Sequence, residues 1–149
     1  MVYGGGGIGL MGEAARAGLA SGGRVIGVIP GHLNTLERAY KEVDLRVVDT
    51  MHERKQMMAD LSEAFVALPG GLGTFDELFE ILTWNQIGLH GKPVGLLNVA
   101  GYFDALLGVI EQAVSEGFAP GTARSRIVVR ETPSQLLEAL DGLGSSPSR

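Results

Sequence analysis

Residues 64–77, with the sequence AFVALPGGLGTFDE, join a short apolar run, a glycine-rich loop and the start of an amphipathic segment. This order predicts a buried strand, a tight loop and a helix. The same alternation continues along the chain, with strands expected at 24–30, 45–49, 64–68, 93–98 and 127–130 and helices at 9–21, 51–62, 74–87, 102–116 and 134–140. Strands that alternate with helices in this way favour an α/β fold with a parallel sheet.

The bulk composition excludes several classes of protein. The 149 residues include 23 glycines, but 45% are hydrophobic and only 19% charged, which is not the composition of a disordered polar chain. The length predicts a single domain over residues 1–143, followed by a flexible tail at 144–149 (GSSPSR). The absence of cysteine excludes disulfides, thiolate metal ligands and a cysteine nucleophile.

The charge and hydropathy patterns narrow the partners and the location. Twelve basic and 17 acidic residues give a net charge of −5, which does not suit general binding to nucleic acid. No apolar run is long enough for a membrane span, and the first residues lack the basic region of a signal peptide. We therefore expect a cytoplasmic protein without nucleic-acid or membrane partners.

The first glycine cluster, residues 4–12 (GGGGIGLMG), follows a very short apolar start. Its G-x-G-x-x-G spacing is that of a dinucleotide site, which also needs an acidic residue at the end of the next strand. That strand ends instead in Pro30, Gly31 and His32, so the dinucleotide interpretation fails. Two alternatives stay open: a loop whose bare backbone, including Gly5 and Gly6, approaches a ligand, or a tight turn without one.

The second glycine cluster, residues 69–77 (PGGLGTFDE), is more specific. Three glycines and a threonine at the expected N-cap direct backbone N–H groups and a hydroxyl to one point, where the helix dipole favours a phosphate: Gly70, Gly71, Gly73 and Thr74. The alternative is a capping box between Thr74 and Glu77. Because a capping box does not need three glycines, the phosphate-binding interpretation is favoured.

A third segment, residues 51–58 (MHERKQMM), opens the helix after the second of the expected strands listed above. Met51, Arg54, Lys55 and Met58 have the i, i+3, i+4, i+7 spacing and share one helix face. The two cations either extend from the edge of a buried face into solvent or contact an anionic or ribose-bearing ligand. The three histidines lack the spacing of metal ligands, so we expect no metal.

Taken together, Val2 and Tyr3 with the first glycine cluster, residues 51–55, residues 69–77 and the strand at 93–98 resemble the LONELY GUY (LOG) family. The family consists of cytokinin riboside 5′-monophosphate phosphoribohydrolases, and the resemblance extends from Val2 to about Leu140. It implies a Rossmann-like parallel sheet with helices on both faces, a homodimer and no cofactor. It also implies hydrolysis of the N-glycosidic bond of cytokinin riboside 5′-monophosphates, with AMP as a further substrate, to free base and ribose 5-phosphate.

The resemblance also assigns roles to individual residues. It implies that Arg54 and Glu77 are catalytic. The expected substrate-binding residues are Gly70, Gly71, Gly73, Thr74, Lys55, Met51, Gly5 and Gly6. The alternative is a non-catalytic nucleotide-binding protein on the same scaffold. A carboxylate beside the sugar favours the enzyme, because binding a phosphate monoester does not require one.

Two further expectations follow from comparison with the family's pattern. Its members usually begin with another strand and helix, so we expect this chain to lack that unit. Family members are also often labelled lysine decarboxylases, but a pyridoxal-phosphate enzyme needs a Schiff-base lysine. The three lysines, Lys41, Lys55 and Lys92, lie in no setting that suggests this role, so we reject the decarboxylase interpretation.

Overall fold

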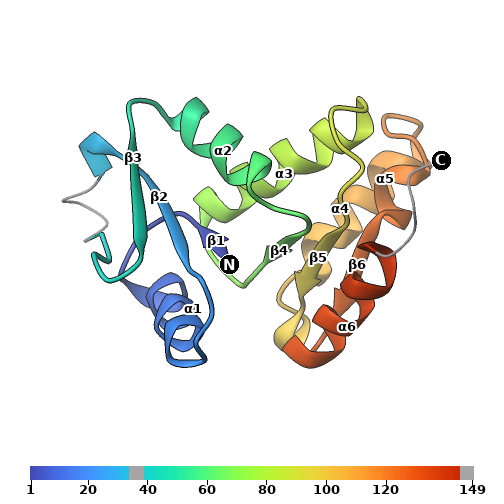
Figure 1. Ribbon diagram of the computed structural model, residues 1–149. Helices are drawn as coiled ribbons and strands as arrows, with labels where there is room; N and C mark the ends of the chain where they lie inside the picture. Colours follow the sequence, from blue (N-terminus) through green and yellow to red (C-terminus); the bar gives the residue numbers. More distant parts are fainter. Residues whose placement is uncertain (34–38, 145–149) are drawn as a thin grey trace. The chain divides into compact units, whose positions relative to one another are not determined.

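The computed structural model (Figure 1) describes residues 1–33 and 39–144. Contacts divide the chain into two compact units, Met1–Ser62 and Glu63–Arg149, and each has its own parallel sheet and apolar core. The single domain expected over residues 1–143 therefore stays a prediction. The expected tail lies outside the described residues from position 145 onwards.

The first unit contains three strands, two helices and a short 3₁₀ helix. In chain order these are β1 (Val2–Tyr3), α1 (Gly9–Ala20), β2 (Ile26–Pro30), η1 (Gly31–Leu33), β3 (Asp44–Val48) and α2 (Met51–Asp60). The strands are all parallel and lie in the order β1-β2-β3. The short strand β1 is thus an edge strand of this sheet.

Helices cover both faces of this sheet. Side chains alternate between the two faces along each strand, so each face presents apolar side chains to a helix. On one face Tyr3 and Val25 pack with Ala15 of α1. On the other face Ile26 and Val28 pack with methionines of α2. The carboxyl end of β1 continues directly into the first glycine cluster, and the carboxyl end of β3 leads to α2.

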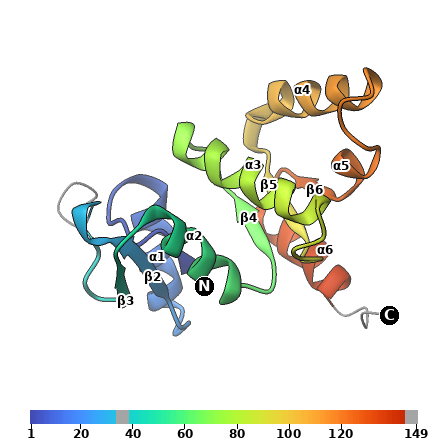
Figure 2. The same ribbon diagram turned by 90° about the horizontal axis from the view of Figure 1, so that it is seen from above.

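The second unit follows the same plan. Its elements are β4 (Phe65–Ala67), α3 (Leu72–Gln86), β5 (Val94–Leu97), η2 (Val99–Gly101), α4 (Asp104–Ser115), α5 (Thr122–Ser125), β6 (Ile127–Arg130) and α6 (Pro133–Gly144). Its strands are parallel in the order β4-β5-β6. Figure 2 shows α6 on the opposite side of this sheet from α3 and α4.

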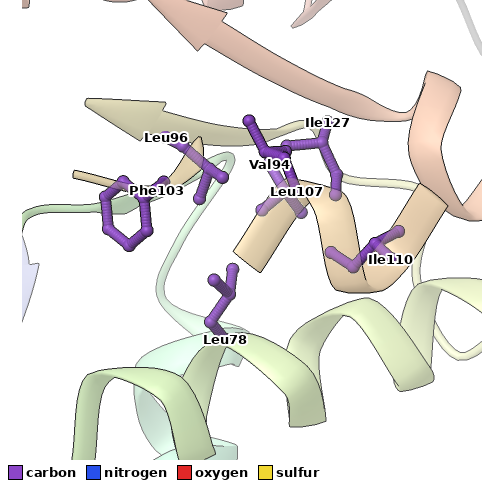
Figure 3. Packing of buried hydrophobic residues seen from close by; sticks show 7 residues of the cluster. All are labelled: Leu78, Val94, Leu96, Phe103, Leu107, Ile110 and Ile127. Carbon is purple, nitrogen blue, oxygen red and sulfur yellow. The ribbon is translucent and has the colours of Figure 1, made fainter. Parts of the chain in front are cut away.

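The main core of the second unit lies between its sheet and the helices α3 and α4. Figure 3 shows side chains from β5, β6, α3, α4 and the residue just before α4 meeting there: Leu78, Val94, Leu96, Phe103, Leu107, Ile110 and Ile127. A second cluster on the other face joins β5 to α6 through Leu97, Leu136 and Leu140. The second glycine cluster leaves β4 at its carboxyl end and enters α3, which is anchored in this core through Leu78.

The predicted α/β fold with parallel strands and helices on both faces is confirmed, with the strands grouped into two three-stranded sheets. Most element bounds fall within about two residues of the predicted ones, the usual uncertainty of helix and strand ends. The largest difference is in α6, which continues to Gly144 instead of ending at 140, and the short helix α5 was not predicted. Among the described residues, no helix is long and apolar enough to cross a membrane.

Candidate active site

The second glycine cluster forms an exposed loop at the start of α3. The helix begins at Leu72, and its N-cap is Gly71, whose extended backbone (φ −90°, ψ −156°) places no side chain over the helix end. Thr74 donates its backbone N–H to the Gly71 carbonyl at 3.0 Å, so Thr74 is the third residue of the helix. The capping box considered between Thr74 and Glu77 is therefore wrong, because glycine occupies the cap. The N–H groups of the first turn point out of this helix end, as an anion site requires.

The glycines of this loop have different surroundings. A Cβ on Gly70 would lie 2.2 Å from the hydroxyl oxygen of Thr74, so a side chain there would force the Thr74 side chain to move. A Cβ on Gly71 or Gly73 would meet no atom within 4 Å. The Thr74 hydroxyl thus lies against Gly70, and open space surrounds the next two glycines. This is the arrangement that lets a ligand approach the backbone closely.

Glu77 lies one helical turn after Thr74 on α3. Both side chains are half-buried, whereas Asp76 between them is exposed. Residues three apart are neighbours on a helix surface. The predicted catalytic carboxylate therefore belongs to the same end of the same helix as the loop.

In the first unit, helix α2 begins with a capping box. The N–H of Glu53 donates to the Thr50 hydroxyl at 3.1 Å, and the Glu53 carboxylate accepts from the Thr50 N–H at 3.2 Å. The same carboxylate accepts from the N–H of Asp49 at 2.9 Å. The Thr-x-x-Glu signature considered at residues 74–77 is thus realised at residues 50–53. There it fixes the first turn of the helix that carries Met51, Arg54 and Lys55.

Arg54 is buried, with only 4% of its surface exposed. Its Nη2 donates to the Gly4 carbonyl at 2.9 Å, and its Nη1 lies 3.7 Å from the Met51 sulfur. The predicted shared face of α2 is confirmed, because Met51, Lys55 and Met58 are half-buried beside it. Since the guanidinium is not at the surface, the interpretation of Arg54 as a side chain reaching into solvent is wrong. The structure instead joins Arg54 to the first glycine cluster.

The glycines of the first cluster are held by the protein itself. Gly4, Gly5 and Gly6 are buried, and Gly5 adopts a left-handed backbone with φ +80°. The N–H of Tyr40 donates to the Gly5 carbonyl at 3.0 Å, and Gly6 forms an antiparallel bridge with Ala39. These contacts fix the path of the loop. The expected contact of Gly5 and Gly6 with substrate stays a prediction.

The predicted site residues therefore gather in two places. The first unit contains Met51, Arg54, Lys55 and the first glycine cluster. The second contains Glu77 and residues 70–74, which comprise the end of the glycine loop and the first three residues of α3 and are called the 70–74 loop below. Within residues 1–33 and 39–144, no group of three or more histidine, aspartate or glutamate side chains is placed to hold a metal ion.

Tyr102 is a residue of this region that the sequence did not reveal. Its hydroxyl donates to the carbonyl of Gly70, 32 positions earlier in the chain. The sequence clue to Tyr102 was its position after β5, at the carboxyl end of the strand, where the ligand sites of parallel sheets lie. An aromatic residue in a loop is too common for that signal to be sufficient.

Comparison with known proteins gives a consistent result. The family model described as "possible lysine decarboxylase" matches residues 11–140. A probable cytokinin riboside 5′-monophosphate phosphoribohydrolase of Oryza sativa subsp. japonica is 52% identical, a cytokinin riboside 5′-monophosphate phosphoribohydrolase of Arabidopsis thaliana is 51% identical, and a second probable one of Oryza sativa is 50% identical. Each alignment covers 142 residues and 95% of this chain, and it covers 67%, 66% and 58% of the three relatives, in that order. The chain thus spans about two thirds or less of the length of these relatives.

Proposed function

Because the chain belongs to the LONELY GUY (LOG) family, we propose that it is a phosphoribohydrolase that acts on cytokinin riboside 5′-monophosphates and on AMP. The reaction adds water across the N-glycosidic bond and releases the free base and ribose 5-phosphate. The observation that carries this proposal is the identity of about half of 142 aligned residues with proteins that are named for this activity. The geometry of the 70–74 loop and Glu77 supports it.

The 70–74 loop binds the 5′-phosphate in this proposal. The first-turn N–H groups of α3 and the helix dipole supply positive potential, and the open space at Gly71 and Gly73 admits the phosphate oxygens. Because the phosphate does not react, its binding serves to hold the ribose in place. Thr74 contributes its hydroxyl beside Gly70.

Glu77 is the proposed catalytic carboxylate. Cleavage of an N-glycoside develops positive charge on the ribose, as in the oxocarbenium-like state of O-glycoside hydrolysis. A carboxylate stabilises that charge, orients ribose hydroxyls or activates water. Glu77 lies one turn from the phosphate loop on the same helix, which supports its assignment to a sugar whose phosphate is bound there.

In the first unit, the proposal assigns Arg54, Lys55 and Met51 to the substrate, together with Gly5 and Gly6. Arg54 is a cation, and its burial keeps that charge from being screened by solvent. It therefore adds positive potential for an anionic nucleotide. Lys55 adds a second cation, and Met51 offers an apolar surface beside Arg54.

The proposal includes neither a cofactor nor a metal, and it places the protein in the cytoplasm as a homodimer. Exposed apolar side chains on α3 and just after it support a partner surface: Phe79 is 43%, Ile87 62% and Leu89 68% exposed. The nucleotide 5′-monophosphate is the small-molecule partner, and no nucleic acid or membrane takes part.

The deciding experiment incubates the protein with AMP and, separately, with isopentenyladenosine 5′-monophosphate, and measures free base and ribose 5-phosphate. We expect both products in equal amounts. Tight binding of both nucleotides without release of base would reject the enzyme and identify a nucleotide-binding protein on the same scaffold. The same preparation is tested for release of carbon dioxide from lysine, where we expect none.

A further inference from the structure

The Gly70 carbonyl, at the beginning of the 70–74 loop, is held from outside the loop by the hydroxyl of Tyr102. We infer that Tyr102 is a positioning residue for phosphate binding, which sets the direction of the peptide group between Gly70 and Gly71. The inference rests on the proposed function, because it takes the loop as the site of the substrate phosphate. Tyr102 itself is assigned no contact with the reacting atoms.

The reason lies in the geometry of the peptide group. The carbonyl of Gly70 and the N–H of Gly71 belong to one planar unit, and peptide bonds in the described ranges are trans. In a trans peptide these two groups point in opposite directions. When the carbonyl is bonded to Tyr102, the Gly71 N–H therefore points away from Tyr102. It is then held in one direction as a donor for an anion.

A glycine pair needs such an external restraint. Glycine adopts left- and right-handed backbone conformations with similar ease, so a peptide group between two glycines rotates at little steric cost. Gly71 also has no neighbour within 4 Å of where a side chain would begin. A loop of this kind binds phosphate well only when its N–H groups are fixed beforehand, since otherwise binding must order them.

The segment that carries Tyr102 is itself rigidly held. Asn98, which is buried, accepts the N–H of Phe103 at 2.7 Å and donates to the Asp104 carboxylate at 2.8 Å. Between these anchors, Ala100 adopts a left-handed backbone (φ 51°, ψ 33°), which is unfavourable for a residue with a side chain. Such a conformation persists only where the surroundings determine it. The side-chain bonds of Asn98 are the observed restraint.

Aromatic packing connects the same segment to α3. The Tyr102 ring meets the Phe103 ring edge to face, with centroids 5.1 Å apart, and Phe103 meets Phe75 of α3 in the same manner at 6.4 Å. Phe103 is fully buried, whereas Tyr102 is 47% exposed. Water can form the hydrogen bond of a solvent-accessible tyrosine hydroxyl, so folding does not require a protein partner for it. Its bond to Gly70 therefore restrains the loop and does not satisfy a buried group.

The test is Tyr102→Phe, which removes the hydroxyl and keeps the ring. We expect its affinity for ribose 5-phosphate, and for inorganic phosphate, to fall about three- to tenfold, the range of one lost hydrogen bond. The KM for AMP rises by a similar factor, whereas kcat stays close to the wild-type value, because Tyr102 contacts no reacting atom. Ser115→Ala is the matched control, because it removes an exposed hydroxyl that donates to the Gln112 carbonyl in the same unit. It should change none of these quantities.

For a wild-type protein that binds the probes, three results would overturn the inference. One is a Tyr102→Phe protein that binds ribose 5-phosphate and phosphate as the wild type does. A second is a fall in kcat of the same size as the rise in KM, and a third is a lower melting temperature that accounts for the weaker binding; both would indicate a general structural role. Failure of the proposed function is distinguishable: wild-type protein would bind ribose 5-phosphate but release no base from AMP, and the affinity comparison would still decide the role of Tyr102. Wild-type protein that binds neither probe would overturn both.

Discussion

The guanidinium of Arg54 occupies the space that a side chain on Gly4 would need. Its Nη2 donates to the Gly4 carbonyl at 2.9 Å, and a Cβ on Gly4 would lie 2.1 Å from the same nitrogen. These residues are 50 positions apart, and both are buried. The first glycine cluster and the position of the proposed catalytic arginine therefore depend on each other.

The first prediction is that Gly4→Ala displaces Arg54. We expect the free energy of unfolding to fall by about 1–3 kcal/mol, as for other overpacked sites. Release of base from AMP should fall more than about tenfold, because even a small displacement of a group that positions the substrate lowers the reaction rate strongly. Denaturant unfolding and the base-release assay measure the two effects.

The control for Gly4→Ala is Gly108→Ala, at an exposed position inside α4 where a Cβ meets no atom within 4 Å. This change should leave activity unchanged and raise the free energy of unfolding by up to about 1 kcal/mol, since alanine favours helix. In an Arg54→Ala background, the stability cost of Gly4→Ala should largely disappear. Full additivity of the two changes would contradict the packing explanation.

The contact between Gly4 and Arg54 illustrates which features the sequence could predict. The strands, the helices and the shared face of α2 follow from apolar periodicity, which is a local property of the chain. The four consecutive glycines at residues 4–7 look equivalent in the sequence, and only the fold brings a guanidinium to one of them. The contact of Tyr102 with Gly70 was unpredictable for the same reason.

The position of the capping box could not be predicted for a different reason. Thr-x-x-Glu occurs at residues 50–53 and again at 74–77, and the local pattern does not distinguish the two sites. The start of the helix decides between them. Because Gly71 takes the extended backbone of an N-cap, α3 begins two residues before Thr74, which places that threonine inside the helix.

The second prediction separates the glycines of the phosphate loop. In Gly70→Ala the new methyl group collides with the Thr74 hydroxyl, so we expect a loss of about 1–3 kcal/mol in stability as well as weaker binding of ribose 5-phosphate. Gly71→Ala meets no neighbour, so its free energy of unfolding should stay within about 1 kcal/mol of wild type. Its affinity for ribose 5-phosphate should nevertheless fall, because the methyl group occupies the space proposed for the ligand. Unchanged affinity in Gly71→Ala would place the phosphate elsewhere.

The third prediction concerns Glu77. Because α3 begins at Leu72 with glycine as its N-cap, Glu77 is not part of a capping box, and Glu77→Gln removes no helix cap. We expect kcat for AMP to fall at least about 100-fold, the lower range for loss of an acid–base group. Affinity for ribose 5-phosphate should stay close to wild type, because the loop is unchanged. Steady-state kinetics and calorimetric titration make the comparison, and wild-type turnover in Glu77→Gln would remove the residue from the catalytic set.

The last prediction is a pH dependence of stability that arises from His90. The backbone N–H of Lys92 donates to His90 Nδ1 at 3.1 Å, so the ring proton lies on Nε2, which donates to the Ile81 carbonyl at 2.9 Å. This bonding selects neutral histidine, because a proton on Nδ1 would break the bond from Lys92. Burial lowers the pKa of His90 below its usual value. The hydrogen bond to the Ile81 carbonyl partly opposes this effect, and the positive charge of Lys92 adds to it.

The sign of the effect follows from the lowered pKa. As the pH falls below the ordinary histidine pKa of about 6.5, the unfolded chain takes up a proton before the folded chain does, which favours unfolding. The contribution of His90 to stability is therefore fully present above that pH and is lost as the pH falls through the folded-state pKa. For one proton, the slope cannot exceed about 1.4 kcal/mol per pH unit. Urea unfolding at a series of pH values between about 5 and 8 measures it.

Two variants identify the source of that slope. His90→Gln should be less stable than wild type at neutral pH, because it loses the ring contact with Phe65, whose centroid lies 5.1 Å away. It should also lose less stability on acidification, since the titrating group is gone. His32→Gln changes an exposed histidine and should keep the wild-type slope. Equal slopes in wild type and His90→Gln would assign the pH dependence to other groups and would contradict the half-buried neutral ring as its cause.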